Sequence, residues 1–366
     1  MEAKAIFNKM KIVQEHLLNF FDEENDTICF TDLINKIDKI NIKSQYEIKE
    51  FLYIISKISD NHTRKFNLIS KIEQLLLHFK EEIKQNFTNA SIFNIFKKNK
   101  RILLFLFEEQ LIKIDENILS VFSKPKYIAK NYYEYFLPEI LSYHKKKPIE
   151  ADETSMKIFN QKRKIGENDD YICTLIQKDS VIDFISYVNK TNYPLSSNIK
   201  TSIFETNRFL LKSQQYNLIE YAAFFGSMQI IKYLFMNKVK LTSYIWFCAI
   251  HGRNPELIHF LEENGIKSDD STFENCYIES ILCFHIDLSN YISEKNPDES
   301  QYYDTFTQLF KCHNYFFLSE NDLHPIVLMY AIYYDFIYMV KFLSKDKNMN
   351  ETLKISLFIT FNNVLN

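Results

Sequence analysis

The sequence predicts an all-α protein in which an N-terminal helical region precedes a stack of short helical repeats. Three observations predict this fold class. Residues 1–124 contain neither glycine nor proline, so the residues that most often interrupt helices are missing there. Apolar residues recur every three to four positions, which is the spacing of one helix face. After residue 170 a short apolar pattern returns several times, as expected of a repeat protein.

Three stretches of the N-terminal region carry the helical spacing clearly. In 47–58 and 71–87 the apolar residues fall on one face, and 101–114 is apolar nearly all round at its start. The two faces consist of Ile48, Phe51, Leu52, Ile55 and Ile58, and of Ile72, Leu75, Leu76, Phe79 and Ile83. A helix that is apolar on every side is typical of a buried position. We therefore expect an N-terminal helical region over 1–143.

Residues 144–170 differ in composition from both flanking regions. Charged residues are dense, apolar residues thin out, and Pro148 and Gly166 appear. Such a stretch is typical of an exposed boundary between domains, so we expect a charged linker here. Its basic clusters, 145–147 and 162–164, also have the form of a split nuclear-localisation signal, although a solvated linker produces the same runs.

The repeated pattern after residue 170 reads apolar, usually apolar again, polar, aromatic, apolar. Its copies begin at Val181, Ile230, Leu257, Leu288 and Met339, which are 49, 27, 31 and 51 residues apart. Periods of about 20–50 residues indicate an array in which each unit buries its apolar face against its neighbours. The two long intervals have room for an insertion or for an eroded unit.

Residues 217–241 (NLIEYAAFFGSMQIIKYLFMNKVKL) resemble an ankyrin repeat, and 243–266 resemble a second one. The matching positions are paired alanines or their equivalent, an inter-helix glycine, an apolar pair, a later leucine and a closing glycine. They are Ala222, Ala223, Gly226, Ile230, Ile231 and Leu234 in the first unit, and Ala249, Gly252, Leu257, Ile258, Leu261 and Gly265 in the second. The first unit departs from the pattern at Asn217–Glu220, where Thr-Pro-Leu-His is usual, and at Lys238, which replaces the closing glycine.

Physical reasons support these matches. Alanine on the first helix of a pair lets the neighbouring helix approach closely, and glycine adopts the left-handed conformation that ends a helix at low cost. The apolar pair and the following leucine form one stripe on the second helix. With the phrases SIFETNRFLL (202–211), LIEYAAFFGS and AIHGRNPELIHFLEENGI, the chain resembles a large family of ankyrin-containing proteins of unknown function, expanded in parasitic protists.

The resemblance implies a divergent ankyrin-repeat stack over 171–366 that serves as a protein–protein interaction scaffold or adaptor without a catalytic site. Ankyrin stacks usually contact targets through the fingers between repeats and through the inner helices. The implied binding residues are Lys238, Lys240, Thr242, Ser243, Trp246, Arg253 and Asn254. Trp246 has two interpretations, as a partly exposed anchor for a partner or as core filling between units.

Composition excludes several classes of function. A net charge of −3 gives no sign of the overall positive charge that favours binding of nucleic acid or anionic membranes. No window approaches the roughly 18 apolar residues of a membrane span, and four isolated glycines cannot form a phosphate-binding loop. The six cysteines are scattered without a CxxC motif, which favours a reducing compartment. We expect an intracellular protein, cytoplasmic or nuclear, that binds a protein partner and needs no cofactor.

Two chemical alternatives remain open. Cys248 with His251 or His259 has the residue types of a nucleophile and its base, although Cys248 takes the place of a small packed residue in its unit. A zinc-stabilised module would draw on a second set of residues, whose irregular spacing is unlike that of a structural zinc site. That set is Cys276, Cys283, His285, Cys312 and His313.

Overall fold

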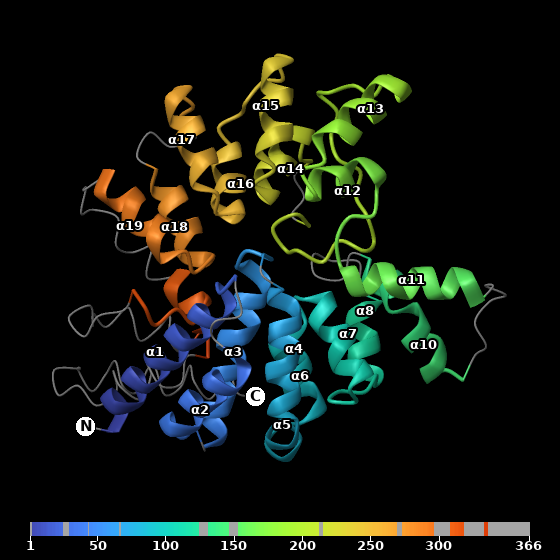
Figure 1. Cartoon of the computed structure of the whole chain (residues 1–366). Helices are drawn as coiled ribbons and strands as arrows, with labels where there is room; N and C mark the ends of the chain where they lie inside the picture. Colours follow the sequence, from blue (N-terminus) through green and yellow to red (C-terminus); the bar gives the residue numbers. More distant parts are fainter. Residues whose placement is uncertain are drawn as a thin grey trace. The chain divides into compact units, whose positions relative to one another are not determined.

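A computed structural model gives the fold over most of the chain. It describes residues 2–24, 29–42, 44–65, 67–123, 131–145, 153–211, 215–268, 273–295, 308–317 and 333–335. Within these ranges the regular elements are all helices, and one isolated β-bridge joins Asn198 to Asn217 (Figure 1). The predicted all-α class is confirmed.

The chain divides into two compact units. Unit 1 comprises 1–58, 64–71 and 280–366, and unit 2 comprises 59–63 and 72–279. The helices α3 (Gln45–Asn61), α4 (Leu68–His78) and α18 (Glu274–Leu282) each contribute residues to both units. The boundaries expected from composition, after residues 143 and 170, both fall inside unit 2.

Unit 1 contains α1 (Glu2–Phe21), α2 (Phe30–Ile40), most of α3 and α19 (Ile286–Lys295). The predicted apolar face of α3 is confirmed, because all five of its residues are buried. A buried polar contact joins α3 to the segment 308–317, where His313 Nδ1 lies 2.6 Å from Glu50 Oε1 and the His313 ring stacks on Tyr53. Sequence-distant parts of unit 1 are thus held by polar contacts as well as by apolar ones.

Unit 2 begins with a series of short helices. They are the end of α4, then α5 (Lys80–Asn86), α6 (Asn89–Phe96), α7 (Lys100–Glu108), α8 (Glu116–Phe122), α9 (Tyr132–Tyr135), α10 (Leu137–Tyr143) and α11 (Glu153–Ile165). The single helix expected over 71–87 is two, because the backbone leaves helical geometry at Phe79, which is half-buried. Residues 101–106 of α7 are buried, as their all-round apolar pattern predicts.

Most of the described part of the expected linker, 144–170, is a helix, α11. Its Arg163 is only 3% exposed. The guanidinium donates to the backbone oxygen of Tyr135 at 3.0 Å and to Glu139 Oε2 at 2.7 Å, while Tyr135 Oη donates back to the Arg163 carbonyl. The basic cluster 162–164 is therefore partly inside the fold, where hydrogen bonds and an ion pair hold the guanidinium of Arg163.

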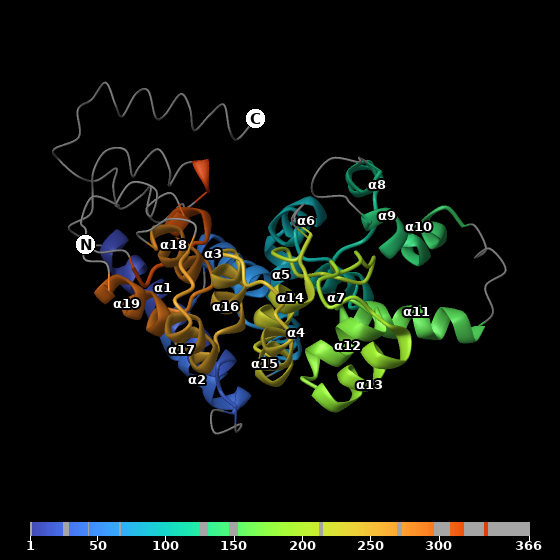
Figure 2. The ribbon, with the colours of Figure 1, turned by 90° about the horizontal axis from the view of Figure 1, so that it is seen from above.

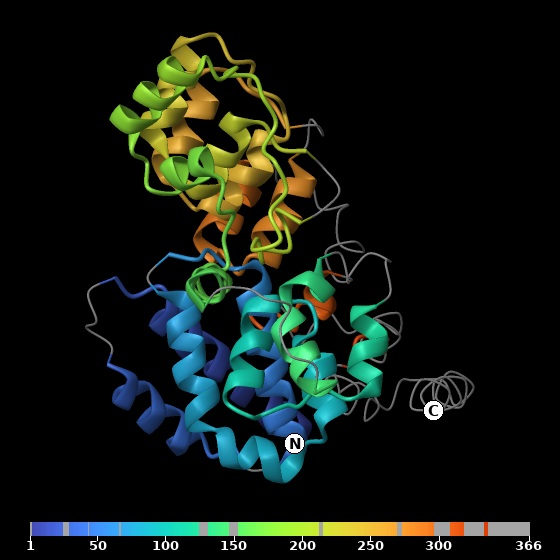
Figure 3. The same ribbon diagram turned by 90° about the vertical axis from the view of Figure 1, so that its right-hand side faces the viewer.

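The second half of unit 2 is built from helix pairs that lie side by side (Figures 1 and 3). The pairs are α12 (Tyr171–Gln177) with α13 (Val181–Thr191), α14 (Leu218–Phe225) with α15 (Met228–Met236), and α16 (Ile245–Gly252) with α17 (Pro255–Glu263). First helices contact first helices, α12 with α14 and α14 with α16, and α13 contacts α15. The copy of the repeated pattern at 339–343 lies outside the described residues.

Each pair is antiparallel because only a few residues separate its two helices. The short turns therefore lie at one end of the pairs, which we call the turn edge (178–180, 226–227 and 253–254). The described residues of the longer connections lie at the opposite end, which we call the loop edge (192–211, 215–217, 237–244 and 264–268). Helices of eight or nine residues separate the two edges by about 12 Å.

The two inter-helix glycines have different roles. Gly226 has φ 67° and ends α14, with its N–H bonded to the carbonyl of Ala223, as predicted. Gly252 is still helical, and the left-handed residue after it is Arg253, with φ 43°. The expectation of a left-handed glycine is thus wrong for Gly252. A Cβ at this position would lie 2.5 Å from the carbonyl oxygen of Ala223, so glycine is needed for the close approach of α14 and α16.

Candidate interaction surface

Side chains at the turn edge connect each helix pair to the next. Ser227 Oγ donates to the carbonyl of Ile176 at 2.6 Å. The Asp179 carboxylate accepts from the N–H groups of Gln229 and Ile230, both at 3.0 Å, and so satisfies the first turn of α15. Asn254 Nδ2 donates to the carbonyl of Gly226 at 3.0 Å. These bonds fix the register of three successive pairs.

An insert connects α13 to α14, and the structure describes its residues 192–211 and 215–217; it is the yellow-green chain that follows α13 in Figure 2. Phe209, from this insert, is buried and its ring contacts Phe224 on α14 and Tyr244 and His251 at α16. The ring of Phe209 therefore covers part of the inner helices themselves.

Polar contacts hold the insert to earlier parts of unit 2. Thr206 bonds to the carbonyl of Gly166 through both its N–H and its Oγ1, at 3.1 and 2.7 Å. Ser202 Oγ donates to Asp169 Oδ1 at 2.6 Å, and the buried Lys100 ammonium donates to the carbonyl of Ile203 at 2.8 Å. Irregular backbone in a buried position requires such partners, and here they come from the segment expected to be a linker and from α7.

The structure separates the seven predicted binding residues. Lys238 and Lys240 are exposed at the loop edge, where Thr242 and Ser243 are half-buried. Arg253 and Asn254 lie at the turn edge, at the other end of the helices. The seven residues therefore do not form one surface.

Trp246 belongs to the core of unit 2. It is 2% exposed, its indole N–H donates to the carbonyl of Ile266 at 2.8 Å, and its ring meets Phe273 edge-on. Of the two interpretations of this residue, core filling between units matches the structure, and the exposed anchor does not.

The side chains of two other predicted binding residues are hydrogen-bonded within the chain. Thr242 Oγ1 donates to Glu220 Oε1 at 2.6 Å. The Asn254 side chain caps α17 through the N–H groups of Glu256 and Leu257. Since a capping side chain is already bonded, Asn254 has a structural role, and the two lysines are the predicted residues best placed to meet a partner.

A group of three tyrosines lies at the loop edge of the first pair, of which Tyr171 is exposed and Tyr187 and Tyr193 are half-buried. Tyr171, at the start of α12, is 54% exposed and its ring centroid is 5.0 Å from that of Tyr187 on α13. Tyr187 is in turn 6.2 Å from Tyr193, which begins the insert. Burial raises the pKa of Tyr193, and the charge of Asp170 raises it further. Composition gave no reason to single out these three among the 23 tyrosines.

A cavity of about 460 Å³ lies between the insert and α14. Its wall includes the buried side chains of Glu205, Tyr216 and Tyr221 together with Lys200 at the loop edge. Burial, and next the charge of Glu205, raise the pKa of Tyr221 well above its usual value, so this hydroxyl stays protonated. Gln177 Nε2 donates to it at 2.9 Å.

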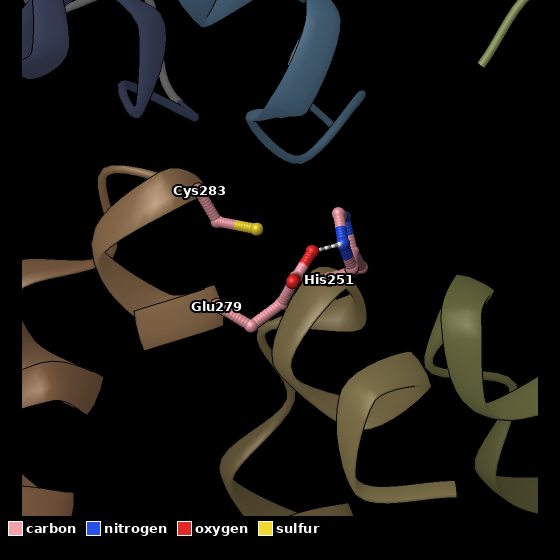
Figure 4. Close-up of side chains that lie close together, drawn as sticks. All are labelled: His251, Glu279 and Cys283. Atoms are coloured by element: carbon pink, nitrogen blue, oxygen red, sulfur yellow. Dashed lines mark hydrogen bonds and ion pairs between the residues drawn. The ribbon is translucent and has the colours of Figure 1, made fainter. Parts of the chain in front are cut away.

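The residues of the enzyme alternative do not form an accessible pair. Cys248 is fully buried, and His259 is exposed on α17, where its Nδ1 lies 3.6 Å from Glu262 Oε2. His251 is buried, and its Nε2 lies 2.8 Å from Glu279 Oε1 on α18 (Figure 4). Figure 4 also draws Cys283, which belongs to unit 1, whereas His251 and Glu279 belong to unit 2. A nucleophile that water and substrate cannot reach is poorly suited to covalent catalysis.

The residues of the zinc alternative are also distributed. Cys276 belongs to unit 2 and the other four to unit 1. Cys312 Sγ contacts the carbonyl of Gln308 at 2.9 Å, and the two ring nitrogens of His313 face Glu50 Oε1 and the carbonyl of Tyr334. These contacts give Cys312 and His313 structural roles within unit 1.

Comparison of the chain with family models, curated proteins and solved structures gave no match. None of the described helices is both long enough and apolar enough to pass through a lipid bilayer.

Proposed function

We propose that this protein is a non-catalytic interaction scaffold whose helix pairs, α12/α13 to α16/α17, form a divergent ankyrin-like stack. The observation that carries the proposal is the set of turn-to-turn hydrogen bonds, from Ser227, Asp179 and Asn254, which join three pairs in one register. Stacked pairs of this kind offer an extended surface without a deep catalytic pocket.

The placement of the sulfur and imidazole groups favours a scaffold over an enzyme. Cys248 and Ala249 are both fully buried within α16. They occupy the positions at which the ankyrin pattern has small, packed residues. The His251 ring is held between Glu279 and the rings of Phe209 and Phe224. Cys248 and His251 therefore each have a packing role that accounts for their position, whereas His259 lies exposed on α17.

The proposal places the partner at the loop edge, and affinity capture with quantitative mass spectrometry tests it. Reversing the charges of Lys238 and Lys240 (K238E/K240E) should deplete captured partners, because both side chains are exposed there. Reversing Arg253 (R253E) is the matched control, because it changes the turn edge and should leave capture unchanged. Equal recovery of the same proteins with wild type and with K238E/K240E would contradict the proposal.

A further inference from the structure

We propose that the cavity between the insert and α14 binds a small organic cation, an amine or a guanidine with an apolar body. The proposal adds a ligand site to the protein and does not depend on the scaffold function. The residue that selects the ligand is Glu205, which lines the cavity together with Tyr216 and Tyr221.

The cavity combines buried walls with an exposed mouth. Among its lining residues, Glu205, Leu210, Tyr216 and Tyr221 are buried. Four exposed lining residues form what we call the mouth, namely Asn198, Lys200, Thr201 and Gln215. The volume of about 460 Å³ falls within the roughly 300–1,000 Å³ of small-molecule sites. A small molecule therefore has a path from solvent to a buried carboxyl group.

Hydrogen bonds fix the walls of the cavity. The Ile199 N–H donates to the carbonyl of Tyr216 at 2.7 Å, and Tyr216 Oη donates to the carbonyl of Phe209 at 2.6 Å. On the other side, Asn168 Nδ2 donates to the carbonyl of Lys200 at 2.7 Å. Walls that are bonded in this way keep the cavity preformed, which lowers the entropy lost when a ligand binds.

Glu205 supplies a negative charge inside the cavity. The side chain is buried, and Oε1 accepts from the N–H of Asn207 at 2.7 Å. A carboxylate can accept about four hydrogen bonds in all, so this bond leaves capacity for the donors of a ligand. An ammonium or guanidinium group matches the carboxylate, because it carries the opposite charge and donates several hydrogen bonds.

Other charges near the cavity also favour a cation. Lys200, at the mouth, lines an adjoining hollow together with Asp169 and Asp170. Among the described residues that line the cavity or this hollow, three are acidic and one is basic. The negative charge extends to the cavity wall, where burial and then the charge of Glu205 raise the pKa of Tyr221.

The rest of the lining suits an organic cation better than a metal ion. Glu205 is the single carboxylate among the described residues of the cavity wall, whereas Mg²⁺ and Ca²⁺ require about six or more oxygen ligands. Ile199, Leu210 and Leu211 contribute apolar surface beside the two tyrosines. The ligand that fits these walls therefore carries one cationic group on an apolar or aromatic body.

A ligand-observed NMR titration of the full-length protein tests the proposal with three probes of similar shape: phenethylamine, phenethyl alcohol and phenylacetate. Phenethylamine should bind about tenfold more tightly than the other two, because it alone forms charge-assisted hydrogen bonds with Glu205. The variant E205Q keeps the size of the side chain and an acceptor for Asn207, and should abolish this preference. E81Q, on the exposed surface of α5, changes the net charge equally and should preserve it.

A second variant, Q215K, tests the proposal at an exposed position and so decides the question if E205Q fails to fold. The added positive charge at the mouth should weaken binding of phenethylamine and leave that of phenethyl alcohol unchanged. Circular dichroism checks the fold of both variants.

Several outcomes would overturn the proposal. They are no binding of phenethylamine, equal binding of the three probes, tightest binding of phenylacetate, or a preference for the amine that persists in folded E205Q or in Q215K. Tighter binding of a peptide with a single lysine than of phenethylamine would place the cation on a protein and reject a small-molecule ligand. Partner capture with K238E/K240E tests the scaffold function separately, since neither lysine lines the cavity.

Discussion

Among the described glycines, Gly252 is the one at which an added Cβ should lower the stability of the fold most. The helices α14 and α16 meet there at backbone distance, and backbone atoms cannot move aside as a flexible side chain can. Sequence analysis found the glycine but assigned it the wrong reason. A glycine pattern does not distinguish a left-handed residue from a close contact, because both exclude a Cβ.

The substitution G252A should therefore lower the free energy of unfolding by about 2 kcal/mol, as expected of an overpacked core. Gly265 provides the control, since it has φ 66° and no atom within 4 Å of its added Cβ. G265A should cost only the strain of its conformation, about 1 kcal/mol. Urea unfolding followed by circular dichroism measures both variants, and a G252A protein as stable as wild type would contradict the close contact.

Asp169 should contribute a pH-dependent part of the stability. Burial acts to raise the pKa of its carboxyl, but hydrogen bonds from Lys162 and Ser202 and the Lys162 charge outweigh burial and lower the pKa below 3.8. A carboxyl whose pKa is lowered by folding stabilises the fold above its unfolded pKa and loses this effect as pH falls through the folded value.

The variant D169N should therefore be less stable than wild type near neutral pH, and the difference should shrink as the pH falls below 3.8. Urea midpoints measured across this pH range test the expectation. S202A is the companion variant, because it removes one of the two hydrogen bonds and should reproduce part of the loss. A difference between wild type and D169N that stays constant with pH would show that the carboxylate charge has no role.

At the scale of helices, periodicity predicted which faces are buried but missed how elements are joined. The five apolar residues of α3 are all buried, because their regular spacing places them on one helix face that packs against the core. The break at Phe79 and the ordered helix α11 were not predicted. Both depend on partners far away in the sequence, and local composition contains no record of the bonds that Arg163 makes to Tyr135 and Glu139.

The variant R163M should detach α11 and lower the free energy of unfolding by about 3 kcal/mol, because it removes the buried guanidinium that pairs with the half-buried Glu139 and bonds to the carbonyl of Tyr135. K157M, on the exposed face of the same helix, is the control and should be close to neutral. Hydrogen exchange of the peptide that covers 153–165 reports whether the helix has loosened. Unchanged exchange in R163M would mean that apolar contacts alone hold α11.

At the scale of the whole molecule, the cysteines report on the integrity of both units. Cys29 is exposed, and Cys173, Cys248, Cys276, Cys283 and Cys312 are buried. Native alkylation followed by mass spectrometry should modify Cys29 first, and the buried thiols should react only as denaturant opens the fold. Rapid modification of Cys248 under native conditions would contradict its burial and favour the enzyme alternative.

Sequence analysis predicted the helical class and the two helix pairs that best match the repeat pattern, but it did not find all residues of the loop edge. Lys238 and Lys240 were identified, whereas Tyr171, Tyr187 and Tyr193 were not. These residues come from separate stretches of the chain, and only the packing of α12 beside α14 brings their loops to one edge. Trp246 was selected for its rarity, although rarity does not predict exposure.

The backbone contact between Ala223 and Gly252 has a consequence for tracing the ancestry of this chain. Apolar positions can exchange leucine, isoleucine and phenylalanine freely. Sequence similarity at these positions is therefore lost as composition drifts. A site that tolerates no Cβ, facing a fully buried alanine, has almost no such freedom. A search for distant homologues should therefore give the most weight to this alanine and glycine and to the interval between them.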